Sequence, residues 1–263
     1  MGRYELVPTG SATSAAEAVP PGGVVTITAS PRRGVDATVG LAVDLSGMNL
    51  NVVPHLAARL VRDRRHLEEL AQRLADAGIT ELFVIGGDGP PRGEFSEALE
   101  VILAMERIGH RFSIGVAGYP EGHPLISDDK LAAALAAKEP HASYLVTQMC
   151  FDSAAIGAWI ETIRARGIEL PVLIGLPGVV AMTRLLPVAA RIGVGASLRF
   201  LTRHRGLWRK VFAPNYSPTD LLAELSPVFA APAAGVVGLH LYTFNQVAAT
   251  EAWRLELLSA LTR

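Results

Sequence analysis

The feature that most constrains how this chain can fold is a regular alternation of short apolar runs with longer segments of helical period. Eight runs are rich in branched and aromatic residues and apolar almost throughout, which is typical of strands covered on both faces. Such an alternation predicts parallel strands joined by helical crossovers. The runs are residues 4–8, 24–29, 50–56, 82–88, 113–121, 142–149, 171–178 and 235–243.

Helices are predicted between these runs. One segment places three leucines on one face, charged residues on the others and Gly78 at its end. Another begins after Asp152, a side chain suited to cap a helix N-terminus. The small-residue stretch 10–23 is expected to be a loop with a short first helix. The four amphipathic segments are residues 62–79, 128–140, 153–168 and 249–263.

Eight strands interleaved with helices in a chain of 263 residues predict an α/β fold, a (β/α)8 TIM barrel that forms a single domain over residues 1–263. A doubly wound sheet is the alternative, because the order of the strands cannot be read from the sequence. In a barrel, the C-terminal ends of all strands meet at one mouth, where active sites lie. Polar residues at the strand ends are therefore the candidates for function.

The charge balance and the cysteine count limit the kinds of partner and compartment that we expect for this chain. Lys and Arg number 24 against 25 Asp and Glu, so no overall charge attracts nucleic acid or an anionic membrane. The single cysteine, Cys150, excludes an internal disulfide, suits a reducing compartment and is expected to serve in packing. With no leader pattern and no apolar run of membrane length, we expect a cytoplasmic protein. The seven histidines show no metal-ligand spacing, so no metal is expected.

Three polar residues at strand ends carry the main chemical hypotheses. Glu5 alternates with apolar neighbours, so its carboxyl group would face the barrel interior, where burial raises the pKa of a general acid, unless the first strand is frayed and exposed. Asp88 lies in GGDGPP, which lacks the dinucleotide and Walker patterns. It either closes a turn or faces a flat ligand that the glycines admit. Gln148 either bonds a heterocycle or is a satisfied core amide.

Six motifs in one order resemble those of a known family. VPHL precedes a helix that ends in AGI, as in the third unit of the methylenetetrahydrofolate reductase family. YELVP resembles its FEFFPP, GGDGPP its RGDPP and AGYPEGHP its AAYPExHP, while TQMCFD resembles its TQxFFD and HLYTFN its HFYTxN. The matches run from residue 4 to residue 245, so the resemblance covers nearly the whole chain.

This resemblance implies a (β/α)8 barrel that reduces 5,10-methylenetetrahydrofolate to 5-methyltetrahydrofolate, with a reduced folate as the substrate. Glu5 falls on the family's general acid, Asp88 on the aspartate that holds the pterin, and Gln148 on a glutamine that contacts the folate. Further substrate contacts are assigned to Tyr242, Asn245 and Phe151. Cofactor contacts are assigned to Thr28, His55, Gly87, Tyr119, Glu121 and His123.

The chain departs from the family where flavin phosphates would bind. Gly86 replaces the arginine of RGD, residues 135–143 lose most of a basic pair, and the second strand ends in TASPRRG instead of TYGAGG. These changes weaken the expectation of bound FAD, and we predict direct hydride transfer from NADH or NADPH. A conventional FAD-dependent reductase and a non-catalytic folate binder are the alternatives. Arg32, Arg33 and the basic run 199–210 are candidate contacts for phosphate or for a glutamate tail.

Overall fold

The computed structural model describes residues 2–191 and 215–261. Eight parallel strands form a closed barrel in the order β1-β10-β7-β6-β5-β4-β3-β2. This closure confirms the predicted TIM barrel, and the doubly wound alternative was wrong. The first and last residues of each predicted strand lie within three positions of those of an observed strand. The strands are β1 (Gly2–Leu6), β2 (Val24–Ile27), β3 (Asn51–Ala57), β4 (Glu81–Ile85), β5 (Ser113–Gly118), β6 (Tyr144–Thr147), β7 (Val172–Pro177) and β10 (Val236–Tyr242).

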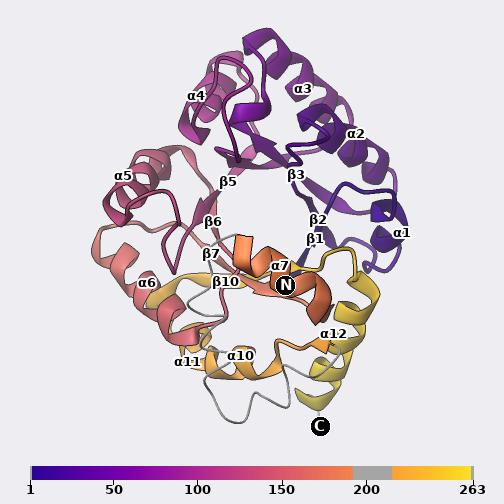
Figure 1. The fold of residues 1–263 in the computed structure, drawn as a ribbon, viewed down its shortest axis with the longest axis vertical. Coiled ribbons are helices and arrows are strands. Elements are labelled where there is room, and N and C mark those ends of the chain that lie inside the picture. Colours follow the sequence, from indigo (N-terminus) through magenta and orange to yellow (C-terminus); the bar gives the residue numbers. More distant parts are fainter. Residues whose placement is uncertain (1, 192–214, 262–263) are drawn as a thin grey trace.

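Most of the helices surround the strands as an outer ring whose sequence colours run from indigo through magenta to yellow, so that the last helix lies beside the first (Figure 1). All four predicted amphipathic segments are helical, and the short first helix is present. The helices are α1 (Ala12–Ala16), α2 (Val35–Ser46), α3 (Arg64–Asp76), α4 (Ala98–Ile108), α5 (Asp128–Lys138), α6 (Ser153–Ala165), α7 (Met182–Arg191), α10 (Thr219–Glu224), α11 (Ser226–Ala230) and α12 (Val247–Leu261).

Local sequence explains where these helices begin. The side chain of Asp152 accepts hydrogen bonds from the backbone amides of Ala154 and Ala155 at 2.9 and 3.0 Å, which confirms it as the cap of α6. Asp63 caps α3 in the same way through the amide of His66. The antiparallel pair β8 (Val180–Ala181) and β9 (Asn215–Tyr216) was not predicted, because two-residue strands leave no periodic signal.

The core has two layers. One layer fills the space between the strands and the helices, and a smaller apolar cluster fills the barrel itself. Glycines make room for the large rings in that interior. A Cβ atom at Gly115 would lie 2.2 Å from the ring of Tyr144, and one at Gly175 would lie 2.8 Å from the ring of Tyr242. The interior cluster consists of Val53, Phe83, Tyr144, Val146 and Leu173.

Two expectations concern the surface. Among the described residues, no helix is both long enough and apolar enough to cross a bilayer. Arg32 and Arg33 are exposed in the loop between β2 and α2. The basic run 199–210 lies outside the described residues.

Replacing Gly115 by Ala tests the packing of the barrel interior. The added methyl group would collide with the Tyr144 ring, so we expect the free energy of unfolding to fall by about 1–3 kcal/mol. The matched control is Gly10→Ala, because a Cβ atom at Gly10 has no neighbour within 4 Å. Urea unfolding of both variants and the wild type measures the difference, and equal stability of the two variants would contradict the packing described for Gly115.

Candidate active site

The carboxyl group of Glu5 lies inside the barrel, as the alternation of β1 predicts. Its neighbours Tyr4 and Leu6 are buried on the opposite side, where the hydroxyl of Tyr4 bonds to Glu251 of α12. Glu5 Oε2 lies 3.0 Å from Nε2 of His240 on β10 and 3.9 Å from Nε2 of His55 on β3. Three strands thus bring one carboxyl group and two imidazoles together.

Burial controls the ionisation of this cluster. It raises the pKa of Glu5 to about 7, against a smaller opposing effect of His55. It also lowers the pKa of His55 to about 4 and that of His240 to about 3. Near neutral pH both imidazoles are therefore neutral, and Glu5 is close to the midpoint of its titration. The contact between Glu5 and His240 is accordingly a hydrogen bond between a partly protonated carboxyl group and a neutral ring.

Free polar atoms remain in the cluster. Within the described parts of the chain, Nε2 of His55 and Nδ1 of His240 are buried without a hydrogen-bond partner. The backbone next to them is fixed, since the hydroxyl of Thr243 donates to the carbonyl oxygen of Glu5 at 2.6 Å. An unpaired lone pair costs less than an unpaired N–H, so we infer that the proton of His240 is on Nε2 and that this N–H donates a hydrogen bond to Glu5. A ligand can satisfy the atoms that remain.

Asp88 lies in the loop between β4 and α4, at the C-terminal mouth of the barrel. Its side chain is exposed, and the glycines on either side adopt left-handed conformations, with φ of 89° at Gly87 and 79° at Gly89. Burial raises the pKa of Tyr119, and the charge of Asp88 adds to this effect, so the two side chains are near each other. The Tyr119 ring meets His123 edge-on, with 5.5 Å between the ring centroids. The predicted residues of the fourth and fifth strand ends thus come together.

Gln148 follows β6 at the same mouth. Its backbone amide donates to the carbonyl oxygen of Gly118 at 2.7 Å, and its side-chain oxygen accepts from the amide of Met149 at 3.0 Å. The orientation of the side chain is therefore set, which leaves its NH2 group to donate to a ligand. Cys150 is 1% exposed, and burial first and the charge of Glu121 second raise its pKa. This thiol belongs to the packing, as expected.

The residues assigned as substrate contacts differ in their burial and in the hydrogen bonds they already make. The Tyr242 ring lies inside the barrel with its centroid 4.9 Å from that of His240, and its hydroxyl donates to the carbonyl oxygen of Thr147. Phe151 is 2% exposed and packs in an apolar cluster at the rim. The amide of Asn245 is engaged, because it accepts from the backbone N–H of Val7 at 2.8 Å and donates to its carbonyl oxygen at 3.0 Å. We interpret Asn245 as a residue that holds the first loop.

Thr28 and Gly87 lie at the ends of β2 and β4. The amide of Thr28 donates to the carbonyl oxygen of Leu6, and its own carbonyl oxygen accepts from Thr38. Gly87 is pressed against β3, where a Cβ atom would lie 2.9 Å from that of Ala57. The predicted cofactor contacts therefore occupy adjacent strand ends on one side of the mouth.

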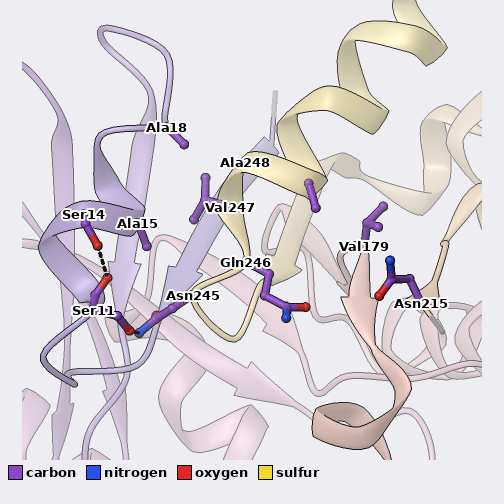
Figure 2. A pocket seen from close by; sticks show the side chains of 11 residues that line it. Ser11, Ser14, Ala15, Ala18, Val179, Asn215, Asn245, Gln246, Val247 and Ala248 are labelled. Carbon is purple, nitrogen blue, oxygen red and sulfur yellow. Dashed lines mark hydrogen bonds between the residues drawn. The ribbon is translucent and has the colours of Figure 1, made fainter.

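A hollow of about 420 Å³ lies at the rim between α1 and the start of α12 (Figure 2). Two amides of its lining are engaged: Asn245 also donates to Thr9 and Ser11, and Gln246 accepts from the amide of Ala181 at 2.8 Å. Asn245 is the only predicted site residue in its lining of described residues. The other predicted site residues do not line this hollow.

Two residues at this mouth were missed from the sequence. His240 stands in the HLYTFN motif, and the alternation that places Glu5 inside also places His240 inside, so that signal was available. Arg59 follows β3 and donates to carbonyl oxygens of the Asp88 loop, which no pattern indicates.

Glu5, His55 and His240 are also the described residues whose ligand atoms could surround a metal ion, all lying within 4.8 Å of one another. Here the carboxyl group and the His240 imidazole bond directly to each other, and the absence of a metal stays a prediction.

Comparison with known proteins decides the family. A family model described as methylenetetrahydrofolate reductase matches residues 15–255. The chain belongs to the methylenetetrahydrofolate reductase family. This match spans seven of the eight barrel strands, from β2 to β10, while β1 with Glu5 lies before it. The resemblance to this family is confirmed.

Three relatives carry the same name. Methylenetetrahydrofolate reductase 1 of Schizosaccharomyces pombe is 31% identical over 136 residues, 51% of this chain and 22% of the relative. The 5,10-methylenetetrahydrofolate reductase of Pectobacterium carotovorum is 27% identical over 209 residues, 75% of this chain and 66% of the relative. Methylenetetrahydrofolate reductase (NADH) 1 of Arabidopsis thaliana is 26% identical over 220 residues, 68% of this chain and 33% of the relative. The chain thus spans less than two thirds of each.

The raised pKa of Glu5 predicts a pH-dependent difference in stability between the wild type and Glu5→Gln. A folded pKa of about 7 against an ordinary 4.5 means that the folded state holds a proton that the unfolded state loses between these pH values. The contribution of Glu5 to stability is therefore complete below pH 4.5 and lost as the pH rises through 7. Relative to Glu5→Gln, the wild type should lose on the order of 3 kcal/mol across this window.

Urea unfolding at several pH values measures this difference. Both histidines are neutral in the folded state over most of this window, so their contributions to stability largely cancel between the two proteins. A stability difference that stays constant between pH 4.5 and 8 would show that Glu5 is not buried in the way described.

Proposed function

We propose that this protein reduces 5,10-methylenetetrahydrofolate to 5-methyltetrahydrofolate, with NADH or NADPH as the hydride donor. The observation that carries the proposal is the buried carboxyl group of Glu5, bonded to neutral His240 at 3.0 Å and with a pKa raised to about 7. A general acid works best when its pKa lies near the working pH. Membership in the reductase family supports the same reaction.

In this mechanism the protonated carboxyl group of Glu5 gives its proton to the ring nitrogen that leaves the methylene carbon. The five-membered ring opens to a 5-iminium cation, and hydride from the nicotinamide adds to the methylene carbon. The substrate gains one proton and one hydride, and NAD(P)H becomes NAD(P)⁺. The Nε2–H of His240 then stabilises the carboxylate that Glu5 becomes.

Asp88 and Gln148 have supporting roles in this proposal. The carboxylate of Asp88 at the mouth holds the pterin and stabilises the positive charge of the iminium intermediate. The NH2 group of Gln148 is oriented by the bond between its oxygen and Met149, and it donates to the plane of the folate. Orienting the substrate before the reaction lowers the barrier, because less freedom is lost in the transition state.

The described residues do not fit the diphosphate of a flavin. Gly86 offers no side chain where the family has an arginine, and the guanidinium of neighbouring Arg59 is bound to carbonyl oxygens of the Asp88 loop. Lys138, the base kept in segment 135–143, is half-buried at the end of α5 and interacts with Glu97. These positions support direct transfer of hydride from nicotinamide, which needs only a flat slot above the iminium carbon.

Replacing Glu5 by Gln removes the acidic proton and keeps the shape of the side chain. We expect the turnover number to fall by at least about 100-fold, while tetrahydrofolate binds within a few-fold of the wild-type affinity. For the wild type, kcat/KM should fall as the pH rises above 7, because the acid must be protonated. Steady-state NAD(P)H oxidation and equilibrium binding measure these effects. Glu106→Gln, at a surface ion pair with His141, is the control and should turn over normally.

Purified protein shown by its absorption spectrum to contain no flavin should oxidise NADH or NADPH when given methylenetetrahydrofolate. Such turnover is expected because no step of the proposed mechanism passes through a flavin. Activity that appears only after FAD is added would instead assign an FAD-dependent reductase. Inactivity under both conditions, with folate still bound, would favour a non-catalytic folate binder.

A further inference from the structure

Arg59 binds the Asp88 loop through both its backbone and its side chain. It lies in the short 3-10 helix Ala58–Leu60 after β3, next to the loop between β4 and α4. Its backbone amide donates to the carbonyl oxygen of Gly86 at 3.0 Å, and its carbonyl oxygen accepts from the amide of Arg92 at 2.9 Å. Its side chain makes three more bonds, to the carbonyl oxygens of Gly87 (3.2 Å), Gly89 (3.1 Å) and Ser96 (3.0 Å).

These bonds bracket Asp88. One guanidinium nitrogen donates to the carbonyl oxygens of the residues on either side of it, Gly87 and Gly89. Both glycines are in the left-handed region, so the two peptide units turn their oxygens toward Arg59 in a conformation that other residues rarely adopt. Without the guanidinium, the carbonyl oxygens of Gly87, Gly89 and Ser96 would lose a charged donor. Only backbone bonds would then join the loop to the segment after β3.

The charges of Arg59 and Asp88 both act on the pKa of His123. Burial lowers the pKa of His123, while the charge of Asp88 raises it and that of Arg59 lowers it. The carboxylate and the guanidinium therefore both lie near one imidazole at the mouth. At position 86, by contrast, the chain has no side chain and cannot supply a cation from β4.

We propose that Arg59 is a positioning residue that fixes the loop of residues 86–96, so that the Asp88 carboxylate faces the folate. Arg59 acts through the loop backbone and does not touch the reacting atoms. This inference rests on the proposed function, because it assigns Asp88 a folate to hold.

A double-mutant cycle tests the inference. Arg59→Met should lower kcat/KM for methylenetetrahydrofolate by about 10- to 100-fold, with KM rising, because a misplaced carboxylate no longer meets the pterin. In an Asp88→Asn background the same change should cost less than about threefold, because its target is already gone. Equal losses in both backgrounds, or wild-type kinetics of Arg59→Met while Asp88→Asn is impaired, would overturn the inference. Wild-type kinetics of Asp88→Asn would instead remove Asp88 from the proposed function.

Three further measurements separate positioning from general destabilisation. Arg59→Lys keeps the charge but loses the planar fork, so it should remain impaired, and full activity of this variant would overturn the inference. Arg92→Met is the matched control, since that guanidinium donates from the same loop to the carbonyl oxygen of Pro31, and it should act like the wild type. Hydrogen exchange should quicken in Arg59→Met at residues 86–96 but not in β3 or β4, and unchanged exchange would overturn the inference whatever the activity.

Discussion

The candidate site depends on the burial of one carboxyl group, that of Glu5, inside a closed barrel. An ionised carboxylate is costly in an interior of low polarity, so burial favours the protonated form of Glu5 and the neutral forms of His55 and His240. The three groups lie on different strands and cannot separate while the barrel is closed. The hydrogen bonds that hold the sheet together therefore also maintain a proton donor near neutral pH.

At the mouth of the barrel, by contrast, the exposed Asp88 loop is held by contacts to its backbone. Asp88 is exposed, so burial does not hold its side chain in place. Its loop gains order from the left-handed glycines and from the carbonyl oxygens that Arg59 binds. The guanidinium group of Arg59 therefore binds the backbone of the protein itself, and these bonds set the geometry of the loop.

Strand periodicity predicted most of the fold, because strands covered on both sides are long apolar runs that stand out from amphipathic helices. Helices α2 and α4 were not among the segments singled out from the sequence. The interior position of Glu5 was predicted from alternation in β1. Its pairing with His240 was not, because 235 positions separate them and only barrel closure joins their strands. Arg59 lay beyond prediction, since its partners are backbone atoms without a sequence signature.

The contact between Glu5 and His240 also spans the seam of the barrel, where the first strand, β1, pairs with the last, β10. Asn245 fastens the same seam from above by bonding the backbone of Val7. During synthesis Glu5 is made near the start of the chain, and the His240 to which it bonds is made 235 positions later. The pair of Glu5 and His240 can therefore form only when the cylinder closes.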